Sequence, residues 1–205
     1  MSRADDWSAI ARAADTDDIR ERILTGFRAG KPFTPYVPTV DLPSPMASVL
    51  DFGCGLGRNF PYLTGIAREV VGFDLPAMID RCRDLAPARV RLTSDWDDAC
   101  RQRYDLVFAT LVLQHMDVDV CRRHLEDFAR IAPRTYLLNR VIGDSGDNVF
   151  DLIGRTGLFD AGSCVHVDHD PATHQLRVLG QRMFDDLRTE TVDAHYEVVL
   201  ESRVK

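Results

Sequence analysis

The sequence predicts a single α/β domain in which helices cover both faces of a mostly parallel β-sheet. Between residues 48 and 138, short apolar runs alternate with segments whose apolar residues recur at helical spacing, as in repeated strand–helix units. The runs are apolar throughout, which is typical of parallel strands buried on both faces. A length of 205 residues and a hydrophobic content of 45% fit one globular unit with a single core.

The N-terminal part is expected to contain one helix followed by an extended strap. Apolar residues recur at helical spacing over residues 5–29. The next segment, KPFTPYVPTVDLPSP, holds five prolines, which remove backbone donors and restrict their neighbours. It is therefore predicted to be extended over residues 31–45. Its Phe33 and Tyr36, together with Trp7, form either an aromatic lid over a binding pocket or simple packing contacts.

Five apolar runs are predicted to be the parallel strands, at residues 48–52, 70–73, 90–93, 106–109 and 135–138. The first helix between them is marked by Phe60, Leu63 and Ile66, and Pro61 is tolerated because it falls in the first turn.

Two further helices follow within this region. One presents an apolar face that consists of Met78, Cys82, Leu85 and Ala86. The other carries an apolar stripe between residues 121 and 132, and Asp117 stands where an N-cap is expected.

The last third of the chain differs in character. Residues 143–165 are rich in Gly and Asp, and residues 172–188 are expected to hold a strand and a short helix. Polar and apolar residues then alternate over residues 195–204, which predicts a strand with an antiparallel partner. We therefore divide the domain into an N-terminal helix and strap (1–45), a ligand-binding core (46–142) and a C-terminal region that shapes the substrate site (143–205).

Composition and charge limit the partners and the location of the protein. The net charge is −7 and no block of Lys and Arg stands out, which argues against a protein that grips nucleic acid by its phosphates. The N-terminus lacks the apolar core of a signal peptide, and the longest apolar run, LVFATLVL, is too short to span a bilayer. The five cysteines follow no zinc-binding or paired pattern, so free thiols in the cytoplasm and no metal site are expected.

The stretch DFGCGLG, which follows the first strand, indicates a ligand site. In an open parallel sheet, ligands bind beyond the carboxyl ends of the strands, and glycines there let a ligand approach the backbone. The dinucleotide fingerprint G-x-G-x-x-G fails here, because Arg58 stands where the third glycine should be. Asp51 would also repel a pyrophosphate and suits a cationic ligand instead.

Acidic residues follow the next two strands. Asp74, in VVGFD, can accept hydrogen bonds from both hydroxyls of a ribose, unless it merely caps the next helix. Asp95, in LTSDWDD, can accept from an adenine amine, unless it caps a short helix at residues 97–101. Trp96 either forms a flat apolar wall beside the ligand or packs in the core. A ligand with an ammonium group, a ribose and an adenine, but no phosphate, fits this series.

These motifs, in this order, resemble those of class I S-adenosylmethionine-dependent methyltransferases. The resemblance covers residues 48–142 and implies a Rossmann-like doubly wound sheet with an antiparallel strand at its end, S-adenosylmethionine as cofactor and S-adenosylhomocysteine as product. It also implies contacts to the amino-acid part of the cofactor from Gly53, Cys54, Gly55, Asp51 and the carbonyl of Ala109. By the same resemblance, Asp74 holds the ribose, Leu75 covers the adenine, and Asp95 meets the adenine amine beside Trp96.

The methyl acceptor is less specified. His115, in LVLQHM, is the candidate general base, Gln114 an orienting amide, and Asn139 either an acceptor contact or a turn residue. After the fourth strand the sequence reads ATLV, not the [DN]-P-P-[YFW] pattern that resembles methyltransferases acting on nucleic-acid bases. We therefore expect methylation of oxygen or nitrogen on a small molecule such as a natural product or metabolite.

Other functions stay open at this point. A nicotinamide-dependent oxidoreductase is disfavoured by Arg58 and Asp51. A non-catalytic scaffold that keeps the fold and its cofactor is an alternative, and a polyamine-synthase-like aminopropyl transferase would require a richer acidic pocket. The protein is expected to be a monomer or a homodimer.

Overall fold

The computed structural model describes residues 35–141, 148–161, 163–170 and 175–204, together with residues 9 and 12. Most of the predicted helix at 5–29, and the predicted lid residues Trp7 and Phe33, lie outside the described residues.

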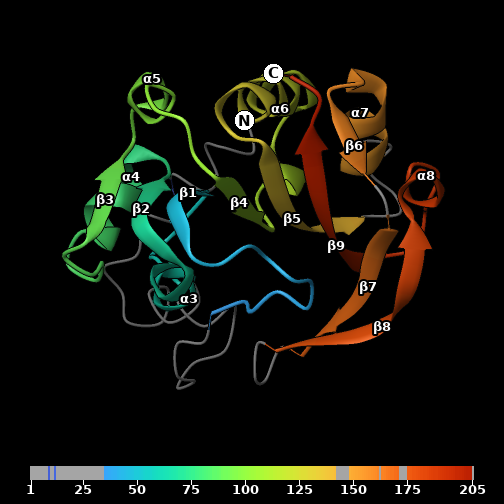
Figure 1. The fold of residues 1–205 in the computed structure, drawn as a ribbon, viewed down its shortest axis with the longest axis horizontal. Helices are drawn as coiled ribbons and strands as arrows, with labels where there is room; N and C mark the ends of the chain where they lie inside the picture. Colours follow the sequence, from blue (N-terminus) through green and yellow to red (C-terminus); the bar gives the residue numbers. More distant parts are fainter. Residues whose placement is uncertain are drawn as a thin grey trace.

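One sheet of nine strands forms the centre of the described structure (Figure 1). The strand order is β3-β2-β1-β4-β5-β9-β7-β8, and the short β6 pairs with β9. The pairings from β3 to β5 are parallel, and those of β9 with β5, β6 and β7 and of β7 with β8 are antiparallel. The strands are β1 Met46–Phe52, β2 Ala67–Phe73, β3 Val90–Thr93, β4 Leu106–Thr110, β5 Arg134–Val141, β6 Phe159–Ala161, β7 Ser163–His169, β8 Leu176–Met183 and β9 Ala194–Ser202. The predicted mostly parallel α/β fold is thus confirmed.

Helices cover both faces of the sheet and form a core on each. The helices are α3 Phe60–Ile66, α4 Pro76–Cys82, α5 Trp96–Ala99, the 3-10 turn η1 Leu113–His115, α6 Val118–Ile131, α7 Val149–Thr156 and α8 Phe184–Leu187. One core joins the sheet to α5, α6, α7 and α8, and the other joins it to α3, α4 and the strap. No helix in the described part of the chain has the length and apolar character that a membrane crossing requires.

The predicted strands match, and two helix details differ. The helix that was expected to present Leu85 and Ala86 ends at Cys82, and Leu85 is exposed, because the chain turns away after residue 82. Asp117 does occupy the N-cap position of α6, but its side chain makes no capping hydrogen bond.

The C-terminal third adds more sheet than its composition indicated. The Gly- and Asp-rich region contains α7, β6 and the start of β7, while β8 and α8 confirm the strand and short helix expected at 172–188. The final strand β9 is antiparallel to β5, as predicted. It does not lie at the edge of the sheet, because β7 pairs with its other side and β8 follows. Its polar positions are therefore not all exposed, and Glu197 is fully buried.

The topology defines where a ligand can bind. Strand order reverses between β1 and β4, so a ligand is expected to bind at the carboxyl edge of the sheet, in a crevice between the loops that follow these two strands. The strap, residues 35–45, is the blue loop that reaches from the start of β1 towards β9 (Figure 1), and its Tyr36, Val40 and Leu42 pack with the core on the α3 and α4 side of the sheet.

Candidate functional site

The glycine loop after β1 forms one wall of the crevice. The backbone N–H groups of Gly53 and Cys54 donate to the carbonyl of Phe73 at 2.9 and 3.1 Å, which ties the loop to the end of β2. Gly53, Gly55 and Gly57 have φ values of +74°, +56° and +83°. These left-handed conformations favour glycine over any residue with a Cβ atom.

The three glycines differ in what their missing side chains leave room for. A Cβ on Gly53 would lie 2.5 Å from Cγ2 of Val112, and one on Gly57 would lie 2.4 Å from the ring of Phe60. A Cβ atom on Gly55 would meet no atom within 4 Å among the described residues beyond its two chain neighbours. The sequence interpretation is therefore refined, because Gly53 and Gly57 admit the protein's own side chains and only Gly55 faces open space.

This difference predicts distinct effects of two alanine substitutions. Gly53→Ala is expected to lower the free energy of unfolding by about 3 kcal/mol or more, since it combines a left-handed φ with a clash against Val112. Gly55→Ala should cost only about 1 kcal/mol, the strain of the backbone alone. Urea unfolding of both variants measures the difference, and equal losses would contradict the assignment.

Asp51 lies at the end of β1 beneath the glycine loop. Its side chain is fully buried, and neither carboxyl oxygen accepts a hydrogen bond of normal geometry from the described residues. Burial, reinforced by the negative charge of Asp74, raises the pKa of Asp51 to about 8, against the lowering effect of the nearby Asn59 side chain. A buried carboxylate without a donor is unfavourable, so this position is suited to a ligand cation or donor.

Asp74 directly follows β2, as predicted. Its Oδ2 accepts from the N–H of Gly55 at 2.7 Å and its Oδ1 from the N–H of Leu75 at 2.7 Å. Burial raises its pKa to about 6, against the lowering effect of these two bonds. It does not cap α4, whose N-cap is Leu75 without a side-chain bond. Asp74 therefore orients the glycine loop and leaves one lone pair on each oxygen.

The residues after β3 play structural roles in this structure. Asp95 is exposed and caps α5, because its Oδ1 accepts from the N–H groups of Asp97 and Asp98 at 3.0 and 3.2 Å. The Trp96 ring packs edge-on against Phe52 and Phe73, and its Nε1 donates to Asp127 at 2.8 Å. The capping and core alternatives are thus what the structure shows, while the adenine contacts stay a prediction.

The opposite wall of the crevice follows β4. Ala109 is buried beside Phe52 of β1, so its position next to the glycine loop fits the expected carbonyl contact. Two residues later Leu111 has a φ of +55°, uncommon for a residue with a side chain, and its N–H donates to the carbonyl of Leu138 at 2.7 Å. This backbone turn directs Val112 onto Gly53 and leads into η1.

The predicted acceptor residues lie near one another beyond this turn. Gln114 accepts from the N–H of Arg140 at 2.7 Å through Oε1, and its Nε2 lies 3.3 Å from Nε2 of the half-buried His115. The orienting role expected for Gln114 is consistent with these contacts. Asn139 lies inside β5, two residues before its end, and is buried with its Nδ2 donating to the carbonyl of Arg140 at 3.2 Å. It occupies no turn.

The strap packs directly against the residues that follow the glycine loop. Tyr36 is buried, with the Arg58 guanidinium 5.0 Å above its ring and Nη1 donating to its hydroxyl at 2.8 Å. The N–H of Tyr36 donates to Oδ1 of Asn59 at 3.2 Å, and Nδ2 of Asn59 donates to Oγ1 of Thr110 at 3.1 Å. Asn59 thus links the strap to the end of β4.

Sequence reasoning missed Asn59 and Glu197. Asn59 precedes a helix and gave no signal beyond that of an ordinary cap, although its side chain makes no capping bond. Glu197 falls on the polar side of an alternating strand, where a solvent-facing side chain is expected. It is buried because Thr39 of the strap and Tyr136 of β5 contact its carboxylate.

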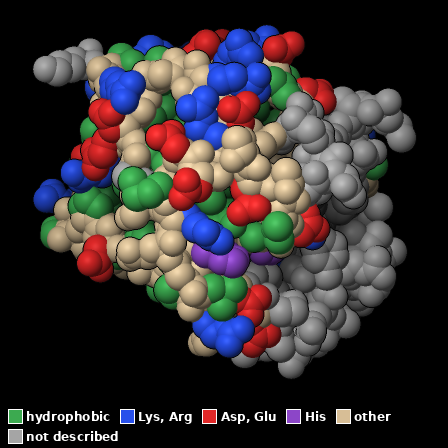
Figure 2. Space-filling view, turned by 90° about the vertical axis from the view of Figure 1, so that its right-hand side faces the viewer, with side chains coloured by type: hydrophobic (Ala, Val, Ile, Leu, Met, Phe, Trp, Pro, Cys, Tyr) green, Lys and Arg blue, Asp and Glu red, His purple; other side chains and the backbone are tan. Residues whose placement is uncertain are grey.

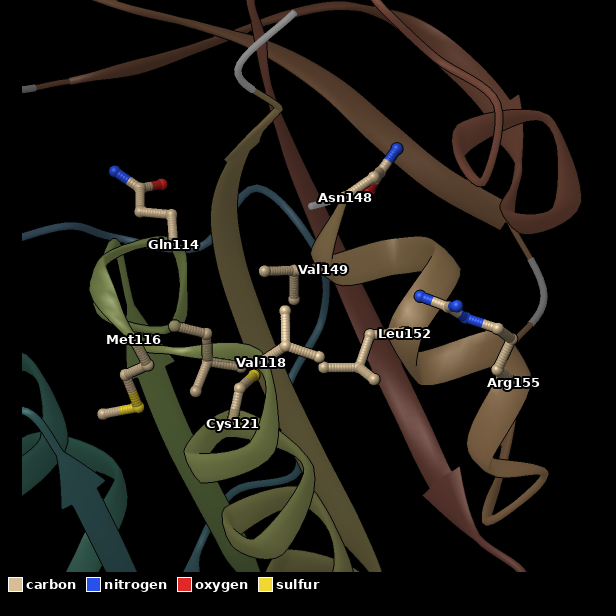
Figure 3. A pocket seen from close by; sticks show the side chains of 9 residues that line it. Gln114, Met116, Val118, Cys121, Asn148, Val149, Leu152 and Arg155 are labelled. Atoms are coloured by element: carbon tan, nitrogen blue, oxygen red, sulfur yellow. The ribbon is translucent and has the colours of Figure 1, made fainter. Parts of the chain in front are cut away.

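A second hollow lies between η1, α6 and α7 (Figure 3). Apolar side chains meet in its centre, among them Val118, Val149 and Leu152, while Arg155 lies to one side of them on α7. Its polar rim is already engaged, since Asn148 accepts from Phe150 and donates to Leu187. We regard it as a packing gap between helices.

Charge is mixed on the side of the molecule that carries β8 (Figure 2). Acidic and basic side chains are interspersed there, and ion pairs such as Arg177–Asp168 and Arg155–Asp151 join them. No group of three or more metal-ligating side chains occurs in the ranges that the structure covers. Three histidines occur between residues 166 and 174, and the last of them, His174, lies outside those ranges.

Comparison with known proteins agrees with this geometry. A family model described as a methyltransferase domain matches residues 49–133. No curated protein sequence matches the chain significantly.

Solved structures share the fold at low sequence identity. N-methyltransferase NodS from Bradyrhizobium japonicum WM9, in complex with S-adenosyl-L-homocysteine, is 13% identical with a TM-score of 0.57, over 96% of this chain and 98% of that one. Magnesium protoporphyrin IX methyltransferase (ChlM) from Synechocystis PCC 6803, with bound S-adenosylmethionine, is 16% identical with a TM-score of 0.50, over 97% and 78%. The [4+2]-cyclase SpnF is 13% identical with a TM-score of 0.56, over 79% and 76%.

The matched region contains the glycine loop, Asp51, Asp74 and the β4 turn, in the fold that these proteins share. Residues 49–133 thus match a methyltransferase domain, and the described structure shares the fold of these solved structures.

Proposed function

We propose that the crevice binds S-adenosylmethionine and that the protein transfers its methyl group to oxygen or nitrogen of a small molecule. The observation that carries this proposal is the fully buried Asp51 side chain on β1, whose oxygens accept no hydrogen bond of normal geometry from the described residues. It lies four residues before Gly55, where an added Cβ atom would meet open space. A ligand ammonium supplies what Asp51 lacks, whereas a pyrophosphate at the same place would be repelled.

The chain's own residues fit the other parts of this ligand. The two free lone pairs of Asp74 suit the ribose hydroxyls, and Leu75 covers the adenine. The backbone of the glycine loop, Gly53 to Gly55 with Cys54 between them, would lie beneath the amino-acid part of the cofactor. The carbonyl of Ala109 would contact the same part from the β4 side. The structural neighbours with bound S-adenosylmethionine or S-adenosyl-L-homocysteine support this choice of cofactor.

The bound cofactor would supply an already activated methyl group on a sulfonium. The protein therefore has to orient the acceptor and remove its proton. His115, half-buried in η1, is the proposed base. Gln114 is proposed to orient the His115 side chain, because its Oε1 is fixed by the backbone N–H of Arg140 and its Nε2 lies beside the imidazole. Tyr36 and Asn139 border the space left for the acceptor.

The acceptor class rests on charge and sequence. With a net charge of −7 and ATLV after the fourth strand, we favour a metabolite or natural product over a nucleic acid. We propose a cytoplasmic monomer or homodimer. Because SpnF shares the fold and is a cyclase, binding alone does not establish methyl transfer, and turnover must be measured.

Ligand-dependent thermal stability tests the proposed cofactor. S-adenosylhomocysteine at 100 times its dissociation constant should stabilise the protein by about 2.7 kcal/mol, while NAD and decarboxylated S-adenosylmethionine at equal concentration should not. Stabilisation by NAD alone would reject the proposal. Release of S-adenosylhomocysteine with a panel of phenols, acids and amines then separates an enzyme from a scaffold.

Substitution of His115 tests the proposed base. His115→Ala is expected to lower kcat by about 10²-fold and to leave the dissociation constant of S-adenosylhomocysteine unchanged, since the residue acts on the acceptor. With cofactor and acceptor saturating at every pH, kcat of His115→Ala measured from pH 6 to 9 should lack the ascending limb that is expected of the parent enzyme. Equal turnover across this range would dismiss His115 as the base.

A further inference from the structure

Glu197 is a fully buried carboxylate that holds the strap to the sheet. It lies on β9, and its two oxygens accept from the N–H of Thr39 at 3.0 and 3.2 Å. The Thr39 hydroxyl also donates to it, as does the hydroxyl of Tyr136 at 2.5 Å. Thr39 itself is exposed on the outside of the strap, so a surface residue is tied to a buried charge.

The strap has a second attachment only three residues earlier. Tyr36 is held by Asn59 and Arg58, directly after the glycine loop, and Asn59 in turn holds Thr110 at the end of β4. The strap is thus fixed at one point beside β4 and at another on β9, with β5 between these strands.

The two attachments are close together in sequence but lie on different parts of the sheet. Residues 36–39 run from the side chain of Asn59 to the side chain of Glu197, and Pro38 restricts the backbone between them.

A buried carboxylate is a poor choice if stability alone is required. Well-packed apolar residues usually stabilise a core as well as a buried charge or better. Glu197 forms its bonds to Thr39 only while the strap lies in this one position, so it specifies a position and does not merely fill space.

We propose that Glu197 is a positioning residue that fixes the strap in one position beside the proposed crevice. Release of Thr39 from Glu197 then limits the rates at which the ligand enters and leaves. The inference rests on the proposed function, because the exchanging ligand is the cofactor. When Thr39 is released from Glu197, the strap stays attached only through Tyr36. The strap residues beside the glycine loop then move away from the sheet more often.

Two substitutions remove one bond each from the same carboxylate. Thr39→Val removes the strap hydroxyl at an exposed site, and Tyr136→Phe removes the core hydroxyl as the matched control. Thr39→Ser should behave as the parent protein. The probe is S-adenosylhomocysteine, with association and dissociation rates from stopped-flow measurements and hydrogen exchange of the strap amides.

We expect Thr39→Val to raise both rate constants of S-adenosylhomocysteine, and the exchange of amides 36–40, by about tenfold, with the dissociation constant within twofold of the parent value. Tyr136→Phe should lower the melting temperature but change none of these. The inference is overturned if Thr39→Val leaves the rates unchanged, or if both variants change them equally. If the parent protein does not bind S-adenosylhomocysteine at all, it is the proposed function that fails.

Discussion

Replacement of Asp74 with alanine is expected to weaken binding of S-adenosylhomocysteine by about 10³-fold. Each carboxylate oxygen already accepts one backbone N–H and has one lone pair left for a ribose hydroxyl. A hydrogen bond to a charged group contributes about 1.5–3 kcal/mol, so the loss of two corresponds to about 10²–10⁴ in affinity. The substitution also releases Gly55 from its tether, which adds to the effect.

Titration calorimetry with a matched control measures this loss. Asp80 carries the same charge on the neighbouring α4, but its side chain is 77% exposed, and Asp80→Ala should leave the affinity unchanged. Hydrogen exchange of the glycine-loop amides should increase in Asp74→Ala alone. Affinity within threefold of the parent value in Asp74→Ala would remove Asp74 from the ligand site.

The central sheet was predictable because its pattern is local. The run at residues 90–93 and the one at 106–109 are apolar segments closed by polar residues, and they become β3 and β4 almost without change. Asp74 and Asp95 follow their strands as expected, since a parallel strand delivers its next residue to the carboxyl edge.

What could not be predicted depends on contacts between distant segments. Glu197 has the spacing of a surface residue, but Thr39 of the strap and Tyr136 of β5, both remote in sequence, donate to its buried carboxylate. Asn59 acquires its role because Tyr36 and Thr110, remote in sequence, meet at its side chain.

The role of the glycines after β1 was also only partly predictable from the sequence. The D-x-G-x-G-x-G spacing indicated ligand approach at all three positions, but the partners of Gly53 and Gly57 are Val112 and Phe60. A sequence alone does not show whether the space beside a glycine belongs to a ligand or to the protein's own core.

Binding of the proposed cofactor is expected to strengthen as the pH rises, because Asp51 is protonated in the free protein near neutrality. Its raised pKa of about 8 results first from burial and then from the charge of Asp74. The ligand ammonium favours the ionised form, so binding releases a proton and lowers this pKa. Between pH 5.5 and 7.5 the affinity should increase about tenfold per pH unit, or about 100-fold in all.

The same group makes the stability of the free protein fall as the pH rises. The folded-state pKa lies above the ordinary value of 3.8, so the folded protein binds the extra proton. The contribution is complete below about pH 4 and is lost as the pH rises through about 8, with a total on the order of 5 kcal/mol. Asp74, whose pKa is raised to about 6, adds a smaller loss over the lower part of this window.

Asp51→Asn separates the two consequences of one buried charge. The amide cannot ionise, so the variant should be several kcal/mol more stable than the parent at pH 8.5 and of similar stability at pH 4. It should also bind S-adenosylhomocysteine weakly and with no pH dependence beyond that from Asp74, because it offers no negative charge to the ammonium. Urea unfolding and calorimetry at four pH values measure both quantities. A variant that keeps the parent's 100-fold pH dependence of binding would show that the proton is released elsewhere, and the assignment of the ammonium to Asp51 would then be wrong.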